Sequence, residues 1–335
     1  LLAELELERD VLADPLETVY LGGGTPTFTE ASELARLFVA LPGAEELTVE
    51  ANPETVTPAL AALLREHGVN RVSLGAQSFR PHLLSVLERR ATPDDVRRAV
   101  HILREAGFDN VSLDLLYGIP GQSTSDLDAD LADALALEPD HLSCYELEAK
   151  PGTRFTHAYG AELERQAVAM EGYFERVVDA LTGAGYRWYE TSSFCLEPAR
   201  VGGRDLRARH NLAYWRGCDY LGIGVGAVST IAGTRRRNPP GLGRYLRTLE
   251  AGERPPRELE VLCRETQLVE RLLLGLRLDE PLPVSAIEGS LDRDAALRLA
   301  TRGLVELAGS GSGQEIRLTH RGRFLGGAVT AELVT

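Results

Sequence analysis

The sequence predicts an α/β protein built on a parallel sheet of the βα-barrel type. Five short apolar strands alternate with helical stretches, and each strand is followed at once by glycine or polar residues. Strands that alternate with helices are typical of parallel sheets, in which all strands point the same way. In barrels of this kind the active site lies at the carboxyl ends of the strands. Polar residues gathered there indicate a ligand site.

Each helix and strand of this first part follows from its own local signals. The strands are predicted at 18–22, 46–50, 71–75, 111–116 and 140–146, and helices at 1–13, 30–40, 58–67, 81–88, 94–106, 124–137 and 160–182. Thr29 and Thr92 are predicted N-caps, and Pro93 suits the first turn of the helix after Thr92. Gly68 and Gly107 suit the positions just past helix ends.

The end of the first strand, at Gly22, Gly23 and Gly24, is the most informative stretch. Three consecutive glycines leave the backbone unshielded and able to take positive φ, so that a ligand can reach main-chain N–H groups. A plain turn at the end of a strand explains the glycines equally well when they are taken alone. The repetition of polar strand ends along the chain favours the ligand site.

After about residue 186 the chain changes character, which predicts a second domain. We expect domains at 1–190 and 191–335, the second a smaller α+β unit with short strands at 220–227. The basic stretch 234–240 is expected to be a solvated loop. A helix is predicted at 265–277. A helix at 293–302, strands at 303–308 and 314–318 and a turn at 309–313 are typical of a winged-helix-like module, here expected to serve packing.

Composition narrows the function further. The 335 residues carry 36 Lys and Arg against 50 Asp and Glu, a net charge of −14. This acidic balance argues against nucleic acid or an anionic membrane as partner. No apolar run reaches the roughly 18 residues of a membrane span and no signal peptide opens the chain, so we expect a soluble, cytoplasmic protein. The four cysteines are widely spaced and predict neither a disulfide framework nor a zinc site.

Five motifs follow one another along the chain. They are Tyr20-Leu21-Gly22-Gly23-Gly24-Thr25-Pro26, Val49-Glu50-Ala51-Asn52-Pro53-Glu54, Gly75-Ala76-Gln77-Ser78-Phe79, Asp114-Leu115-Leu116-Tyr117-Gly118-Ile119-Pro120-Gly121-Gln122 and Arg209-His210-Asn211-Leu212-Ala213-Tyr214-Trp215. In this order they resemble the HemW-type branch of the radical S-adenosylmethionine (SAM) family, which also contains the oxygen-independent coproporphyrinogen III dehydrogenase HemN. The resemblance covers nearly the whole chain. Each motif is modest alone, but together they are highly specific.

The resemblance implies an open, about six-stranded partial barrel that binds SAM. Its SAM-contacting positions match Gly23, Gly24, Thr25, Glu50, Gln77, Arg89 and Asp114. By this reading, the glycines and Thr25 meet the methionyl end, Glu50 pairs the ammonium, and Arg89 takes the carboxylate in two parallel hydrogen bonds. Gln77 and Asp114 bind the ribose hydroxyls. The plainer alternative is that these groups are satisfied locally, and for Arg89 that it forms a salt bridge on a helix surface.

The family also implies a [4Fe–4S] cluster held by a CxxxCxxC motif after its first strand. This sequence has no such motif, and its cysteines cannot replace it by spacing. The chain begins at Leu1 in a helical pattern, so we expect that the first strand and the cluster loop precede it in a longer protein. A degenerate domain is the alternative.

The HemW-type resemblance implies a haem-binding chaperone that passes haem to acceptor proteins. His210 matches the histidine implied as haem ligand, and Tyr214 and Trp215 are placed to cover a porphyrin face. A histidine that only anchors the aromatic segment is the alternative. Arg235, Arg236 and Arg237 are weaker candidates to pair haem propionates. Two further functions stay open, a coproporphyrinogen III dehydrogenase and a non-catalytic SAM- or tetrapyrrole-binding module.

Overall fold

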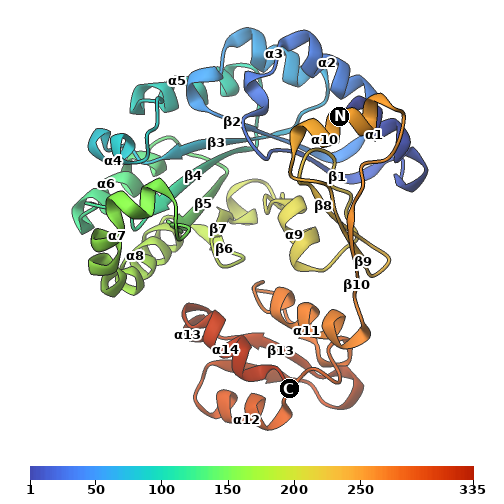
Figure 1. Ribbon diagram of the computed structural model, residues 1–335. Coiled ribbons are helices and arrows are strands. Elements are labelled where there is room, and N and C mark those ends of the chain that lie inside the picture. Colours follow the sequence, from blue (N-terminus) through green and yellow to red (C-terminus); the bar gives the residue numbers. More distant parts are fainter. The chain divides into compact units, whose positions relative to one another are not determined.

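The chain forms two compact units (Figure 1). This computed structural model describes residues 1–335, apart from the side chain of Ser312. The sheet unit comprises Val19–Leu34 and Glu46–Arg207, and the C-terminal unit comprises Leu1–Thr18, Ala35–Glu45 and Ala208–Thr335. The domain boundary expected at residue 190 stays a prediction. Among the described residues, no helix has the length and apolar character needed to cross a membrane.

A seven-stranded, mostly parallel sheet confirms the predicted α/β class. Its strand order is β1-β2-β3-β4-β5-β7-β6, and the parallel register runs from β2 through β5. The last two strands are short and antiparallel. The sheet is open, as a partial barrel requires. Its strands are β1 Leu16–Leu21, β2 Ala44–Ala51, β3 Arg71–Gln77, β4 Val111–Tyr117, β5 His141–Glu146, β6 Tyr186–Trp188 and β7 Ser193–Leu196.

Helices connect these strands, and Figure 1 shows α3 to α8 along one face of the sheet. The predicted start after Thr92 is confirmed, because Thr92 and Asp95 form a reciprocal capping box. The helix predicted at 160–182 is wrong as a single element. Thr153 caps an earlier start, and a 3₁₀ turn at 167–169 separates two helices. The helices are α1 Leu2–Leu7, α2 Ala31–Ala40, α3 Pro58–Glu66, α4 Pro81–Val86, α5 Pro93–Glu105, α6 Thr124–Leu135, α7 Arg154–Gln166 and α8 Met170–Gly183.

The basic stretch 234–240 is not the solvated loop that was expected. Its first four residues form β9 (Thr234–Arg237), the middle strand of a small antiparallel sheet with β8 (Val228–Ile231) and β10 (Glu258–Val261). Glu258 and Glu260 of β10 face Arg237 and Arg235 directly across the sheet. Opposite charges at facing positions stabilise a strand pair, so the acidic partner sequence explains the strand.

The last part of the C-terminal unit has its own apolar core, which includes Leu272, Ile316 and Leu333. Helix α12 (Arg293–Thr301) precedes an antiparallel pair, β12 (Val305–Ala308) and β13 (Glu315–Leu318), at the predicted positions. The remaining elements of this unit are α9 Arg209–Trp215, α10 Leu242–Glu250, α11 Arg264–Gly275, β11 Leu282–Pro283, α13 His320–Phe324 and α14 Gly326–Leu333.

Helix α1 is anchored in the C-terminal unit by buried carboxylates. The side chain of Glu4 is fully buried and accepts hydrogen bonds from Gly224 N, Asn238 Nδ2 and Tyr245 Oη at 2.8, 2.6 and 2.6 Å. Arg257, itself buried, forms ion pairs with Glu4 at 3.3 Å and Glu8 at 3.0 Å. Burying a charge is tolerated only when partners compensate for the lost water, so these contacts fix the helix in place.

We predict that Glu4→Ala lowers the free energy of unfolding by about 3–5 kcal/mol, because it leaves Arg257 and three donors without their acceptor. Glu6 lies on the same helix but its ion pair with Arg9 is exposed, so Glu6→Ala should change stability by less than about 0.5 kcal/mol. Chemical denaturation measures both variants. Equal losses would contradict the anchoring role of Glu4.

Candidate functional site

Three neighbouring strands bring polar side chains together inside the sheet unit. Glu50 on β2 is in register with Ser73 on β3. The Ser73 hydroxyl donates to both carboxylate oxygens of Asp114 on β4, at 3.1 and 3.2 Å. Side chains alternate faces along a strand, so these residues share one face of the sheet. The sequence placed Glu50 and Asp114 at one site, and the structure sets them on either side of Ser73.

The end of β1 joins the same cluster through Tyr20. Its phenol donates a hydrogen bond of 2.6 Å to Glu50 Oε1. A Cβ added at Gly22 would lie 2.6 Å from the Tyr20 ring and 2.9 Å from the Glu50 carboxyl carbon, so a larger residue there would displace the Tyr20–Glu50 pair. Gly23 has φ +75°, and a Cβ at Gly23 or Gly24 would meet nothing within 4 Å. The first glycine therefore permits close packing, and the other two border open space.

Asp114 has the most informative electrostatics of the cluster. Desolvation by the surrounding sheet raises the pKa of its carboxyl to about 6, although Arg71, Ser143 and Ser73 favour the charged form. Glu50 adds to the rise in this pKa, because two nearby carboxylates disfavour each other's charge. Asp114 thus carries a negative charge at neutral pH at a cost in free energy, as ligand-binding groups commonly do.

Gln77 lies at the end of β3, where the register with β4 shifts between Leu74 and Gln77. Its backbone takes φ +64°, which is rare for a residue with a side chain. A Cβ at Gly75 would lie 2.8 Å from Gln77 Nε2, so the amide folds back over that glycine. Gln77 therefore sits on the strand next to Asp114, with a buried side chain.

Arg89 is separate from this cluster in its contacts. It follows α4 in an exposed segment, and its backbone N–H donates to Leu84 O at 2.9 Å. Within the described part of the chain its side chain forms no ion pair, so the alternative of a helix-surface salt bridge has no support. Thr25 is half-buried and starts a 3₁₀ turn over Pro26–Phe28. Among the described residues, neither Arg89 nor Thr25 forms a hydrogen bond or ion pair with Asp114.

Sequence reasoning missed a second polar layer on the same strands. His141 on β5 is fully buried, with Ser112 Oγ 2.9 Å from its Nδ1 and Tyr189 Oη 2.9 Å from its Nε2. Burial and the neighbouring Arg71 guanidinium hold the pKa of His141 well below its usual value, so it is neutral. The signal was present as polar residues two apart in otherwise apolar strands, Arg71 and Ser73, Ser112 and Asp114, His141 and Ser143.

His210 lies in the C-terminal unit, on α9. Its Nδ1 is 2.9 Å from the Thr18 hydroxyl, and its ring meets Tyr214 edge-on with centroids 5.0 Å apart. Tyr214 in turn contacts Tyr220, at 4.5 Å between centroids. The helix thus orients the histidine and aligns it with two aromatic rings.

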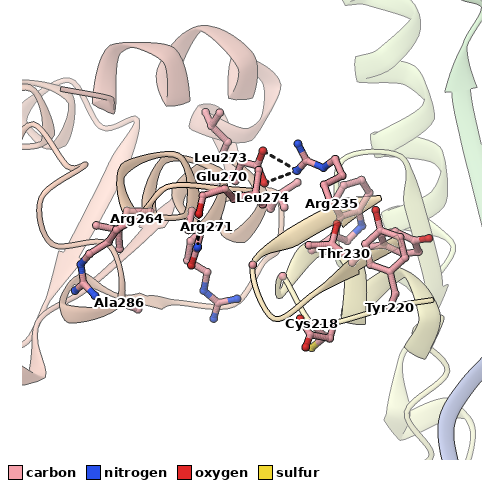
Figure 2. Close-up of a pocket in the computed structure, with 18 residues that line it drawn as sticks. Cys218, Tyr220, Thr230, Arg235, Arg264, Glu270, Arg271, Leu273, Leu274 and Ala286 are labelled. Carbon is pink, nitrogen blue, oxygen red and sulfur yellow. Dashed lines mark hydrogen bonds and ion pairs between the residues drawn. The ribbon is translucent and has the colours of Figure 1, made fainter. Parts of the chain in front are cut away.

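A cavity of about 640 Å³ lies beside these rings (Figure 2). It is lined by α9 and the turn after it, by β8 and β9, and by α11. Tyr214, Trp215 and Tyr220 line it, but His210 does not. The sequence did not indicate the cavity, because part of its wall comes from α11, which lies about 50 residues further along the chain than α9.

The described residues do not fit an iron–sulfur cluster. Cys144 and Cys195 are buried in the sheet unit, and Cys218 and Cys263 are exposed in the C-terminal unit. Burial also raises the pKa of the Cys144 thiol, which disfavours the thiolate that iron requires. Among the described residues no group of three histidine, cysteine or acidic side chains could hold a metal ion. The described residues therefore support no reaction step through a cluster.

The open α/β sheet, with glycine and carboxylates at its strand ends, is of the radical SAM type by comparison with known families and structures. The chain matches the Radical SAM superfamily over residues 2–134 and the HemN C-terminal domain over residues 262–325. The solved structure of Escherichia coli coproporphyrinogen III oxidase (HemN) shares this fold. It superimposes with a TM-score of 0.80 at 23% identity, over 99% of this chain and 81% of that chain.

Curated relatives identify the branch. The chain is 36% identical to the haem chaperone HemW of Mycobacterium tuberculosis, over 99% of this chain and 84% of the relative. It is 33% identical to the haem chaperone HemW of Bacillus subtilis, over 94% and 84% of the two chains. The chain therefore belongs to the HemW family of haem chaperones, as its motifs predicted.

We predict that Asp114→Asn stabilises the protein in a pH-dependent way. Between pH 3.8, the ordinary pKa of this side chain, and about pH 6, the Asp114 carboxyl is already deprotonated in the unfolded chain but still protonated in the folded protein. Folding stability therefore falls as the pH rises through this range. The amide cannot ionise, so the variant should gain about 1–3 kcal/mol of unfolding free energy at about pH 8. That gain should vanish near pH 4.

Urea denaturation at several pH values checks this prediction. Glu105→Gln, which removes an exposed carboxylate on α5, is the matched control and should leave the pH profile unchanged. A gain that does not vary with pH would show that packing, and not the charge of Asp114, is responsible.

Proposed function

We propose that the protein binds haem and passes it to acceptor proteins in the cytoplasm. The single observation that carries this proposal is the 36% identity with a haem chaperone along 99% of the chain. The arrangement around α9 supports it, because a histidine and two tyrosines stand in ring contact beside a cavity. The acceptor protein is expected to supply ligands that take haem over.

In this proposal His210 ligates the haem iron through Nε2. A neutral imidazole has one protonated nitrogen, and the other offers a lone pair to a metal. The Thr18 hydroxyl lies 2.9 Å from Nδ1, so ligation of the iron through Nε2 would leave that contact in place. A hydrogen bond at the other ring nitrogen fixes the orientation of a metal-ligating imidazole. Tyr214, edge-on to His210, supports the ring from one side.

We propose further that the strand ends of the sheet unit hold SAM. Gly23, Gly24 and Thr25 offer main-chain and hydroxyl groups beside open space, which suits the methionyl end. Glu50 keeps Oε2 for the ligand ammonium, since Tyr20 binds Oε1. Gln77 and Asp114 bind the ribose hydroxyls, and Arg89 closes on the carboxylate. When bound, SAM supplies a sulfonium that an electron donor can cleave; these residues hold and orient it.

Two other functions remain as alternatives. A coproporphyrinogen III dehydrogenase draws support from the fold of HemN, but likeness at 23% identity concerns the fold alone. A non-catalytic module would bind SAM or tetrapyrrole without a cluster. The deciding experiment is a haem titration combined with a turnover assay on coproporphyrinogen III. A chaperone binds about one haem per chain and converts no substrate, whereas steady conversion would favour the dehydrogenase.

We predict that His210→Ala weakens haem binding by at least about tenfold and alters the Soret band, because an axial ligand is lost. His101→Ala removes an exposed histidine on α5 and is the matched control, with no expected change. Absorption titration with haem measures both. An unchanged spectrum and affinity in His210→Ala would remove this histidine as the ligand.

We predict that Gln77→Ala and Asp114→Ala each reduce SAM affinity by about tenfold, since each removes hydrogen bonds to the ribose. Asp128→Ala takes away an exposed carboxylate of α6 and should bind SAM as the wild type does. Calorimetric titration with SAM provides the measurement. Wild-type affinity in both site variants would contradict the proposed pocket.

A further inference from the structure

The cavity beside α9 has a size and a wall that suit a large flat ligand. Its volume of about 640 Å³ falls within the roughly 300–1,000 Å³ of cofactor and ligand pockets. Tyr214, Trp215 and Tyr220 supply aromatic surface from one side. Leu268 and Leu274 of α11 supply apolar surface from the other. Such a pair of walls favours a planar aromatic molecule over a flexible polar one.

One atom of this wall lacks a partner. The indole Nε1 of Trp215 is buried, and no hydrogen-bond acceptor for it exists among the described residues. A buried donor without an acceptor is costly, and structures rarely tolerate it. The ring itself is held in place, because the Arg277 guanidinium stacks over it at 4.1 Å from the centroid. An acceptor group on a bound ligand would satisfy this donor.

Charge in the cavity is not balanced. Three arginines, Arg235, Arg264 and Arg271, line it together with two acids, Asp219 and Glu270. Arg235 is already committed, since its guanidinium binds Glu270 at 2.7 and 2.8 Å (Figure 2). It also binds Glu260 at 3.1 Å. Arg235 was one of the weaker candidates to pair a haem propionate, but these two carboxylates already occupy its guanidinium. Asp219 accepts a hydrogen bond from Ala232 N at 3.1 Å.

Arg264 and Arg271 are the cations left to meet a ligand. In the described part of the chain neither side chain has a hydrogen bond or ion pair. They are seven residues apart on α11, so they share one face and lie about 10 Å apart along the helix axis. Arg271 also reaches the turn after α9, because its Nη1 would lie 3.8 Å from a Cβ at Gly217.

We propose that this cavity is the porphyrin seat, with the two propionates of the ligand bound by Arg264 and Arg271. The inference rests on the proposed haem-binding function and adds where and how the porphyrin is held. Arginine binds a carboxylate through two parallel charge-assisted hydrogen bonds, so two free arginines on one face match a dicarboxylate. The aromatic and leucine walls enclose the macrocycle. Recognition at this seat acts on the ring and its acids. His210 does not line the cavity but meets Tyr214 edge-on, so ligation of the iron by His210 requires the porphyrin to extend past the Tyr214 ring.

The test compares an arginine pair variant with a charge-matched control. Arg264→Gln/Arg271→Gln removes both proposed anchors. Arg302→Gln/Arg321→Gln removes two exposed arginines of the same unit that do not line the cavity. Each protein is titrated with haem, with metal-free protoporphyrin IX, and with protoporphyrin dimethyl ester, which has no free carboxylate. Thermal unfolding checks that all variants fold.

We expect the anchor variant to lose at least about tenfold in affinity for haem and for metal-free protoporphyrin. Its affinity for the dimethyl ester should equal that of the wild type, because the lost interaction needs the carboxylates. The control variant should bind all three ligands normally. His210→Ala should bind metal-free protoporphyrin as the wild type does, since that ligand offers no iron.

Two results would overturn the proposal. Haem affinity within about twofold of the wild type in the anchor variant would exclude Arg264 and Arg271 as anchors. An equal loss for the dimethyl ester would show that the substitutions act through packing and not through the propionates. Absence of haem binding by the wild type is a different failure, since it would contradict the proposed function itself.

Discussion

The structure depends on carboxylates that are withdrawn from water and held by specific partners. In the sheet unit, Asp114 is ionised only because Ser73, Ser143 and Arg71 offset part of its desolvation. In the C-terminal unit, Glu4 is fully buried among three hydrogen-bond donors and Arg257. A buried charge costs several kcal/mol unless its geometry is right, so both sites restrict how the chain can fold. The buried carboxylate of Asp114 forms part of a candidate ligand site, and that of Glu4 fixes helix α1.

The two units carry different chemistry. Strand ends in the sheet unit offer open glycine backbone, a carboxylate and an amide, which are the groups that a charged nucleoside ligand needs. The C-terminal unit offers an oriented histidine and, beside it, a cavity lined by aromatic rings and two uncommitted arginines. The HemW family relationship connects both sets of groups to one protein, in which a SAM-type fold supports a haem-handling function.

The sequence predicted those features of the fold that depend on residues near one another in the chain. The alternation of strands and helices, the N-cap at Thr92 and the strand that carries Asp114 follow from periodicity and capping chemistry. The features that the sequence did not indicate depend on residues that are distant along the chain. Arg235 lies in a strand because Glu260 faces it, and Glu4 is buried because Arg257 reaches it from the far end of the sequence. The cavity was not predicted for the same reason, because its wall combines residues of α9 and α11, which are distant in the sequence.

The most direct test of this account is a crystal structure of the protein grown with haem. The account predicts one porphyrin in the cavity beside α9, its face against Tyr214 and Trp215 and its propionates on Arg264 and Arg271. It also predicts that the strand-end cluster around Asp114 contacts no porphyrin. A porphyrin seated over Glu50 and Asp114, with the cavity beside α9 empty, would contradict the division of the two sites on which the account is built.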